Sequence, residues 1–285
     1  MIKILKYFFQ SIIIYLLFII VKIIGLSLSR SLFAFLFKNI GPIMRSNKIA
    51  SENLKKFSKE INKQSEKNII DNMWSNYGMT FVEYIFLKKF RNEDSHIFIK
   101  NENILNEIRE NNQPVIFVSG HFANFELMSM EITKKNIKLA TIYRPLNNVF
   151  LNPFMELIRK KFVCKNQIKK GLSGVKDCID YINSKHNIAL MIDQRVSEGD
   201  RITFFNSKAF TTTLPAQLAL KYNLKIIPIF IERKNINKFE MEIYNPIDSS
   251  VFKNKYELSL ELNKILEGMI VKNPNQWIWS HNRWK

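Results

Sequence analysis

The sequence predicts an α/β fold, in which a sheet with parallel strand pairs is flanked by helices and an apolar helix comes before the sheet. Short runs of β-branched residues alternate with helical patterns between residues 97 and 231, the order expected of such a sheet. A long apolar run occupies residues 4–28. With 285 residues and a hydrophobic share of 46%, the chain can bury a large core. We expect an N-terminal membrane anchor and following apolar helix at 1–45 and one α/β domain at 46–285.

The apolar run is long enough to cross a bilayer about 30 Å thick. A cleaved signal peptide is disfavoured, because no small-x-small site ends the run. Three arrangements stay open: a spanning anchor with Lys22 reaching the interface, a helix lying in the interface, and a buried core helix. Membrane attachment with the rest of the chain on the cytoplasmic side is favoured, because basic residues follow the run at Arg30, Lys38, Arg45 and Lys48.

The charge balance indicates a polyanionic partner. Forty-three Lys and Arg against 25 Asp and Glu give a net charge of +18. Nucleic acid, an anionic membrane surface and an acidic carrier protein all fit that charge. The basic residues are scattered and no nucleic-acid motif is present, which disfavours nucleic acid. No Walker, HExxH or GxSxG motif appears, and the two cysteines lack metal spacing.

Strands and helices can be assigned in chain order from these patterns. Residues 46–87 carry apolar stripes at helical spacing, and Glu83 among them is either a functional carboxylate or a solvated or capped one. After residue 96 we expect strands at 97–99, 115–118, 138–144, 188–192 and 225–231, and helices at 104–109, 152–161, 175–182 and 214–222. A further helix is expected to start near Phe122, because apolar residues then recur every three to four positions.

His121 lies where the central strand ends and this helix begins, at the edge of the sheet where ligands usually bind. Glu126 follows five positions on. The two side chains can meet only if His121 lies in a turn before the helix, which Gly120 permits. A carboxylate touching one imidazole nitrogen leaves the other free as a general base. The alternative is a structural histidine, with the spacing to Glu126 arising by chance.

Polar side chains also follow two other predicted strands. Arg144 follows one, and Asp193, Gln194 and Arg195 follow the other. Ends of parallel neighbouring strands cluster at one edge of a sheet. Both arginines are candidates for bidentate contacts to phosphate or carboxylate, and Asp193 could orient an arginine or a substrate group. Residues 211–213 before Pro215 signal a helix start, with an anion site there as the alternative.

Three of the four tryptophans fall in residues 277–285. That density fits either a membrane-interface belt or a strap that closes over the core.

Together these segments resemble the lipid A secondary (late) acyltransferases, the lauroyl/myristoyl transferase family, within the wider His-x4-Asp/Glu glycerolipid acyltransferases. The resemblance is carried by residues 119–126, 143–146, 193–195, 204–205, 211–212 and 276–285. It covers nearly the whole chain in matching order. It implies a glycerolipid-acyltransferase-like mixed sheet flanked by helices.

The resemblance also implies an inner-membrane enzyme that moves a fatty acyl chain from acyl carrier protein to a hydroxyl of a lipid A precursor, without metal or cofactor. His121 would be the general base, and Glu126 would orient it and stabilise its charge. The substrate would be held by Arg144, Asp193, Gln194 and Arg195. The active domain would face the cytoplasm.

The chain departs from the family in one turn, and two other functions stay open. Asn206-Ser207 follows Phe205 where the family usually has Gly, although Asn tolerates a left-handed turn. Another membrane glycolipid, an aminolipid or a lysophospholipid could be the acceptor. The non-enzymatic alternative is a basic protein that binds membrane surfaces.

Overall fold

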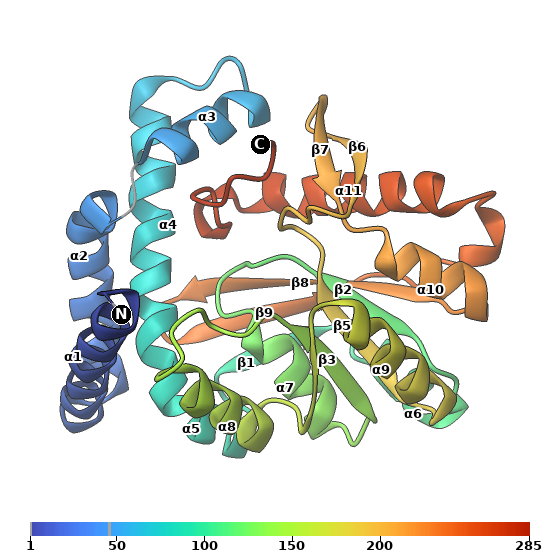
Figure 1. Ribbon diagram of the computed structural model, residues 1–285, viewed down its shortest axis with the longest axis horizontal. Helices are drawn as coiled ribbons and strands as arrows, with labels where there is room; N and C mark the ends of the chain where they lie inside the picture. Colours follow the sequence, from blue (N-terminus) through green and yellow to red (C-terminus); the bar gives the residue numbers. More distant parts are fainter. Residues whose placement is uncertain (1, 45–46) are drawn as a thin grey trace.

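The computed structural model describes residues 2–44 and 47–285 (Figure 1). In this part of the chain, a seven-stranded sheet has the order β1-β9-β8-β2-β5-β3-β4. Its strands are β1 (Ile97–Lys100), β2 (Ile116–Ser119), β3 (Leu139–Tyr143), β4 (Asn166–Lys169), β5 (Asn187–Met191), β8 (Ile226–Asn235) and β9 (Lys238–Ile243). All neighbours pair in parallel except β8 and β9, which are antiparallel. The mixed α/β fold is confirmed.

Helices cover both faces of the sheet (Figure 1). One face carries α5 (Leu87–Asn92), α6 (Asn103–Asn111), α7 (Glu126–Lys134) and α8 (Asn152–Phe162); the other carries α9 (Leu172–Asn183), α10 (Leu214–Tyr222) and α11 (Lys255–Lys272). Along β2, Ile116 and Val118 enter one core and Phe117 enters the other. The strand is therefore buried on both faces, as parallel sheets are.

The N-terminal helices stand beside this sandwich. Gly25, at φ +82°, separates α1 (Ile2–Ile24) from α2 (Leu26–Met44). α2 packs along α4 (Lys63–Glu83) so closely that a Cβ on Gly78 would lie 2.1 Å from the carbonyl oxygen of Phe33. α1 is long and apolar enough to cross a membrane, and only 17% of its most apolar window is buried. This exposure excludes the buried core helix and is compatible with membrane association.

Two points of the N-terminal interpretation change. Arg30 is buried, so it does not contribute to the basic surface that follows α1, whereas Lys38 and Lys48 are exposed. Arg45 and the expected boundary between residues 45 and 46 lie outside the described residues. The chain continues as α3 (Asn47–Phe57), which packs near the start of α4.

The predicted strands and helices are present, with ends shifted by a few residues. The main error concerns α7, which begins at Glu126 and not near Phe122, because residues 120–125 form a loop. The sequence missed β4, β9 and α11, and it missed the separate hairpin of β6 (Asp200–Phe204) and β7 (Ser207–Thr211). β4 is only four residues long and carries a single buried apolar residue, so its periodicity is weak, whereas β9 alternates polar and apolar residues and could have been found from its pattern. Short 3₁₀ turns complete the chain: η1 (Tyr84–Phe86), η2 (Ser249–Val251) and η3 (Pro274–Gln276).

The turn between β6 and β7 is kept without glycine. Phe205 has φ +47° and Asn206 has φ +57°, and Phe204 pairs with Ser207 across the turn. Two successive positive φ angles are the geometry of a type I′ hairpin, where Asn is favoured.

The tryptophan-rich end is a strap over the core, and the interpretation as a membrane belt is wrong. Trp277 and Trp279 are buried in the larger core cluster. The strap is held at both ends: the Asn53 side-chain amide donates to the carbonyl of Trp279, and the Trp284 indole donates to the carbonyl of Phe204.

Candidate active site

The polar residues that follow the strands gather at one edge of the sheet. β2 pairs with β5 and β5 pairs with β3, all in parallel, so the three carboxyl ends lie side by side. A cleft of about 370 Å³ opens there. It is lined by four of the predicted site residues, His121, Glu126, Arg144 and Gln194, together with Arg159 and Lys170 among others. The predicted clustering of strand ends is confirmed.

His121 is held by Asp193. Its Nδ1 lies 2.7 Å from Oδ1 of Asp193, and its backbone N–H donates to Oδ2 over 2.7 Å. The Trp277 indole donates to the same Oδ2 over 2.9 Å. Asp193 is fully buried; burial alone would raise its pKa, but His121 and Trp277 outweigh this and the pKa is lowered. Asp193 is therefore an ionised carboxylate behind the imidazole.

The other imidazole nitrogen is available to the cleft. The short contact with an ionised carboxylate assigns the proton to Nδ1, which leaves a lone pair on Nε2. The Gln194 side-chain amide lies 3.4 Å from that Nε2. A hydroxyl in the cleft that contacts both groups from the side could donate its proton to His121.

Glu126 is occupied by other partners. Its Oε1 accepts from the Tyr84 hydroxyl over 2.7 Å and from Nε of Arg159 over 2.7 Å. His121 does lie in a turn before the helix, as expected, but the carboxylate that contacts it is Asp193. The ring of Phe125, the residue before Glu126, lies edge-on against the His121 imidazole, with 4.6 Å between the ring centroids.

Of the two predicted arginines, Arg144 lines the cleft and Arg195 does not. Arg144 is exposed and lines the cleft beside Lys170, since β3 and β4 pair Tyr143 with Lys169 in parallel register. Arg195 packs its guanidinium over the Phe210 ring, 5.4 Å from the centroid, and does not line the cleft. At α10, Leu214 N–H bonds weakly to the Thr212 hydroxyl, at 3.4 Å.

Sequence reasoning missed Tyr84, Arg159 and Lys170. They lie far apart along the chain, and none belongs to a motif, so only the folded chain brings Arg159 and Lys170 to the cleft and Tyr84 to Arg159 and Glu126. Burial, and then the neighbouring charge of Arg144, lower the pKa of Lys170. Within residues 2–44 and 47–285, no group of three His, Cys, Asp or Glu side chains is placed to bind a metal ion.

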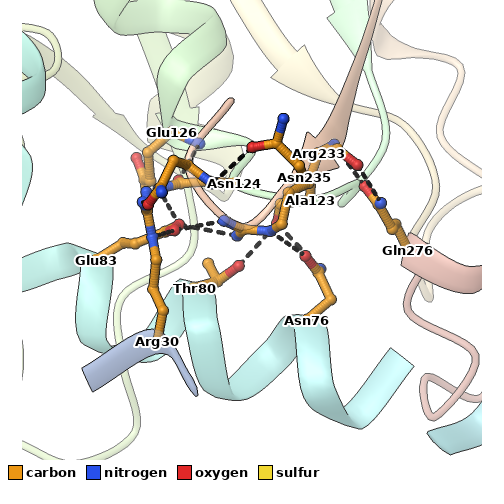
Figure 2. A network of polar contacts seen from close by, with 11 residues as sticks. Arg30, Asn76, Thr80, Glu83, Ala123, Asn124, Glu126, Arg233, Asn235 and Gln276 are labelled. Carbon is orange, nitrogen blue, oxygen red and sulfur yellow. Dashed lines mark hydrogen bonds and ion pairs between the residues drawn. The ribbon is translucent and has the colours of Figure 1, made fainter. Parts of the chain in front are cut away.

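The loop at 120–125 is fixed by its surroundings. A Cβ on Gly120 would lie 2.7 Å from the Phe122 ring, so this glycine is needed for packing. The left-handed residue is Ala123, with φ +42°. Figure 2 shows the polar side chains that surround the loop, among them Glu83, which is fully buried between Arg30 and Arg233. Its carboxylate is not solvated and makes no helix-capping hydrogen bond.

Comparison with known proteins places the chain in a family. The bacterial lipid A biosynthesis acyltransferase family matches residues 1–285. The chain is 24% identical over 225 residues to lipid A biosynthesis acyltransferase 2 of Shigella flexneri, covering 74% of this chain and 68% of that protein. It is 20% identical over 181 residues to the lipid A biosynthesis myristoyltransferase of Escherichia coli K12, covering 62% and 55%.

A solved structure is also similar. The 1-acyl-sn-glycerophosphate acyltransferase PlsC from Thermotoga maritima has a TM-score of 0.43 and 11% identity, covering 89% of this chain and 100% of that one.

The match to the family over the full length sets aside the non-enzymatic alternative. The chain belongs to the bacterial lipid A biosynthesis acyltransferase family and is an acyl-transferring enzyme.

Proposed function

We propose that this enzyme transfers a fatty acyl chain from acyl carrier protein to a hydroxyl of a lipid A precursor, at the cytoplasmic face of the inner membrane. The observation that carries the proposal is the contact between His121 Nδ1 and the buried Asp193, which leaves Nε2 on the side of the cleft, next to the Gln194 amide. This pair is suited to general-base activation of a hydroxyl.

The proposed reaction uses that geometry. The acceptor hydroxyl gives its proton to Nε2 of His121 as its oxygen attacks the thioester carbonyl carbon. Asp193 stabilises the resulting imidazolium. The tetrahedral intermediate collapses, the carbon–sulfur bond breaks, and the imidazolium returns the proton to the leaving thiolate. The products are an ester on the acceptor and a free carrier thiol, with no acyl-enzyme.

We assign the remaining cleft residues to substrate positioning. The Gln194 amide, next to Nε2, orients the attacking hydroxyl or the thioester oxygen. Arg144 and Lys170 are placed to bind an anionic group of the acceptor or the donor. Glu126 keeps Arg159 in place at the wall of the cleft, and this pair contributes to catalysis through the shape and charge of that wall.

The proposed donor is an acidic carrier protein. The net charge of +18 favours association with such a partner. Arg144 and Lys170 at the cleft add positive charge close to where the thioester must enter.

The proposed acceptor is a membrane lipid, because α1 contacts residues 148–150, which directly follow the cleft-lining residues 144–147. The carbonyl of Tyr7 accepts from Asn148, and the Tyr15 hydroxyl donates to the carbonyl of Phe150. Leu146, two residues before Asn148, lines the cleft. A helix held at both points lies along the domain, which favours a helix in the membrane interface over an upright span. We infer that residues 1–45 attach the domain at 46–285 to the inner membrane.

The test is lipid mass spectrometry in a host that lacks its own late lipid A acyltransferase. Wild-type protein should give a lipid A species heavier by one acyl chain, and the mass difference reports the chain length. His121→Ala, folded and still membrane-bound, should give no such species. A heavier lipid A in the His121→Ala strain would remove the general-base proposal.

Other outcomes redirect or overturn the assignment. A new acylated lipid elsewhere in the extract would keep the chemistry but replace lipid A with another glycolipid, an aminolipid or a lysophospholipid as the acceptor. No new species despite good expression, repeated with purified protein, acyl carrier protein thioesters and lipid A precursor, would overturn the proposed reaction.

A further inference from the structure

Two consecutive residues, Glu83 at the end of α4 and Tyr84 at the start of η1, contact the chain on either side of Phe125, where the loop at 120–125 (the catalytic loop) meets α7. Glu83 accepts a hydrogen bond from the Asn124 amide, with 2.9 Å between Nδ2 and Oε2. Tyr84 donates to Glu126 over 2.7 Å. α4 therefore contacts the chain where the loop turns into α7.

Glu83 is unusual among the residues that contact the loop, because it is a charged side chain in the core. Its side chain is fully buried. Arg233 of β8 binds both its oxygens, at 2.6 and 3.0 Å, and Nε of Arg30 binds Oε1 at 2.6 Å. Burial alone would raise the pKa of Glu83, but the two guanidiniums outweigh it and the pKa is lowered. The carboxylate is therefore ionised, and it is a strong acceptor for Asn124.

This contact fixes the Asn124 side chain in one orientation. Because Nδ2 donates to Glu83, Oδ1 of the same amide faces the backbone N–H of Glu126, 3.3 Å away. Asn124 thereby supplies a partner for the first residue of α7, a position whose N–H has no partner within the helix. The loop and the helix start are set by the same amide.

Two other residues of α4 contact Ala123, the residue before Asn124. The Thr80 hydroxyl donates to the carbonyl of Ala123 over 3.0 Å, and Asn76 approaches it at 3.4 Å (Figure 2). The N–H of Ala123 donates to the carbonyl of Gln276, whose side chain pairs with the backbone of Arg233. These contacts keep Ala123 in its left-handed conformation, which L-residues rarely adopt.

The same carboxylate also joins the N-terminal helices to the loop. Arg30 comes from α2, and its Nη1 reaches Asn237 beyond β8 at 3.1 Å. α4 therefore lies between α2 on one side and the catalytic loop on the other (Figure 1). The same carboxylate thus contacts both an arginine of α2 and the Asn124 amide of the loop.

We propose that Glu83 is a positioning residue for acyl transfer, which acts through Asn124 to hold the loop between His121 and Glu126 in its active shape. His121 must stay within hydrogen-bond reach of both Asp193 and the acceptor hydroxyl, and small displacements of a catalytic base are costly. The proposal rests on the proposed function only where activity is the measurement.

The primary test is Asn124→Ala. This variant removes the link from Glu83 to the loop and leaves the ion pairs of Glu83 intact. We expect kcat for acyl transfer to fall at least tenfold, while KM for donor and acceptor stays within threefold. Glu83→Gln leaves two buried guanidiniums without an ionised partner and could fail to fold. Where it folds, the double variant Glu83→Gln, Asn124→Ala should lose no more kcat than the more affected of the two single variants.

The matched control is Asn187→Ala. Asn187 is also buried and also makes two hydrogen bonds, to the N–H of Val115 and the carbonyl of Lys138, but it lies at the opposite end of the strands. A general loss of packing should lower the melting temperature in both variants. Only Asn124→Ala should lower kcat beyond twofold. Equal kcat in the two variants would overturn the positioning role.

A second measurement does not need turnover. The chain has four histidines, so the His121 ring signals can be assigned in a histidine-labelled NMR spectrum by comparison with His121→Ala. Asn124→Ala should shift the His121 signals and Asn187→Ala should not. An unchanged His121 signal in Asn124→Ala would count against the proposal. An inactive wild type with shifted signals would instead count against the proposed reaction alone.

Discussion

Trp277 donates a hydrogen bond from its indole Nε1 to Oδ2 of Asp193, over 2.9 Å, and both side chains are buried. The C-terminal strap thus reaches the carboxylate that holds His121. The last residues of the chain are part of the support of the site, because an indole N–H in the core gives this carboxylate a third donor beside the two from His121.

Trp277→Phe should lower activity as well as stability. The substitution keeps an aromatic ring but removes the donor, and a hydrogen bond to a charged group contributes about 1.5–3 kcal/mol. We expect a lower melting temperature and a kcat reduced about tenfold. Trp279→Phe is the control, since its indole donates to the carbonyl of Pro274 and not to Asp193. If both variants lose stability and neither loses kcat, Trp277 has only a packing role.

Asp193→Asn should cost far more activity than Glu126→Gln. An amide in place of Asp193 favours the wrong imidazole tautomer, a change worth roughly 10⁴-fold in kcat in the serine-protease triad. Glu126→Gln keeps the shape at Arg159 and leaves the imidazole untouched. Steady-state kinetics of the two variants decides between the carboxylates. A larger loss for Glu126→Gln would return the orienting role to that residue.

The stability of the enzyme should fall in acid partly through Asp193. Its pKa is lower in the folded protein than the unfolded value of about 3.9, so the unfolded chain binds more protons near that pH. The contribution is present above about pH 4 and is lost as the pH falls through the folded pKa. Melting temperatures from pH 7 to pH 3 should therefore drop less steeply for Asp193→Asn. Parallel curves for the two proteins would contradict this.

The hairpin between β6 and β7 should tolerate Gly but not Val at position 206. Asn206 has φ +57°, a conformation open to Gly and costly for β-branched residues. Asn206→Gly should change the free energy of unfolding by less than about 0.5 kcal/mol, and Asn206→Val should lower it by about 1–2 kcal/mol. The variants are compared by thermal unfolding in the same detergent. An unchanged free energy of unfolding in Asn206→Val would show that the turn relaxes to another backbone conformation.

Charges on the outer face of α1 should release the protein from membranes. Ile13 and Ile20 are exposed apolar residues of this helix. The double variant Ile13→Glu, Ile20→Glu should lose most of its co-flotation with anionic vesicles, because two carboxylates would have to enter the lipid. Gln10→Glu adds charge at an already polar, exposed position and should float normally. Unchanged flotation of the double variant would rule out attachment through this face.

The sequence alone determined the α/β class and placed His121 at a strand end, because periodicity and strand-ending residues are local signals. It also placed Arg144 and Gln194 at strand ends that meet, since β2, β5 and β3 pair in parallel. The local signal was weakest for β4, which has four residues and only one buried apolar side chain, whereas β9 carries a clear alternation that the sequence analysis missed.

Only the tertiary structure decided which carboxylate contacts His121. Asp193 lies 72 residues away along the chain and Glu126 only five, yet strand pairing brings Asp193 to the imidazole and the loop carries Glu126 to Arg159. Glu83 could not be interpreted for the same reason, because its arginines are 53 and 150 residues distant. Spacing predicts neighbours along one element, whereas a buried charge finds its partners through the packing of several.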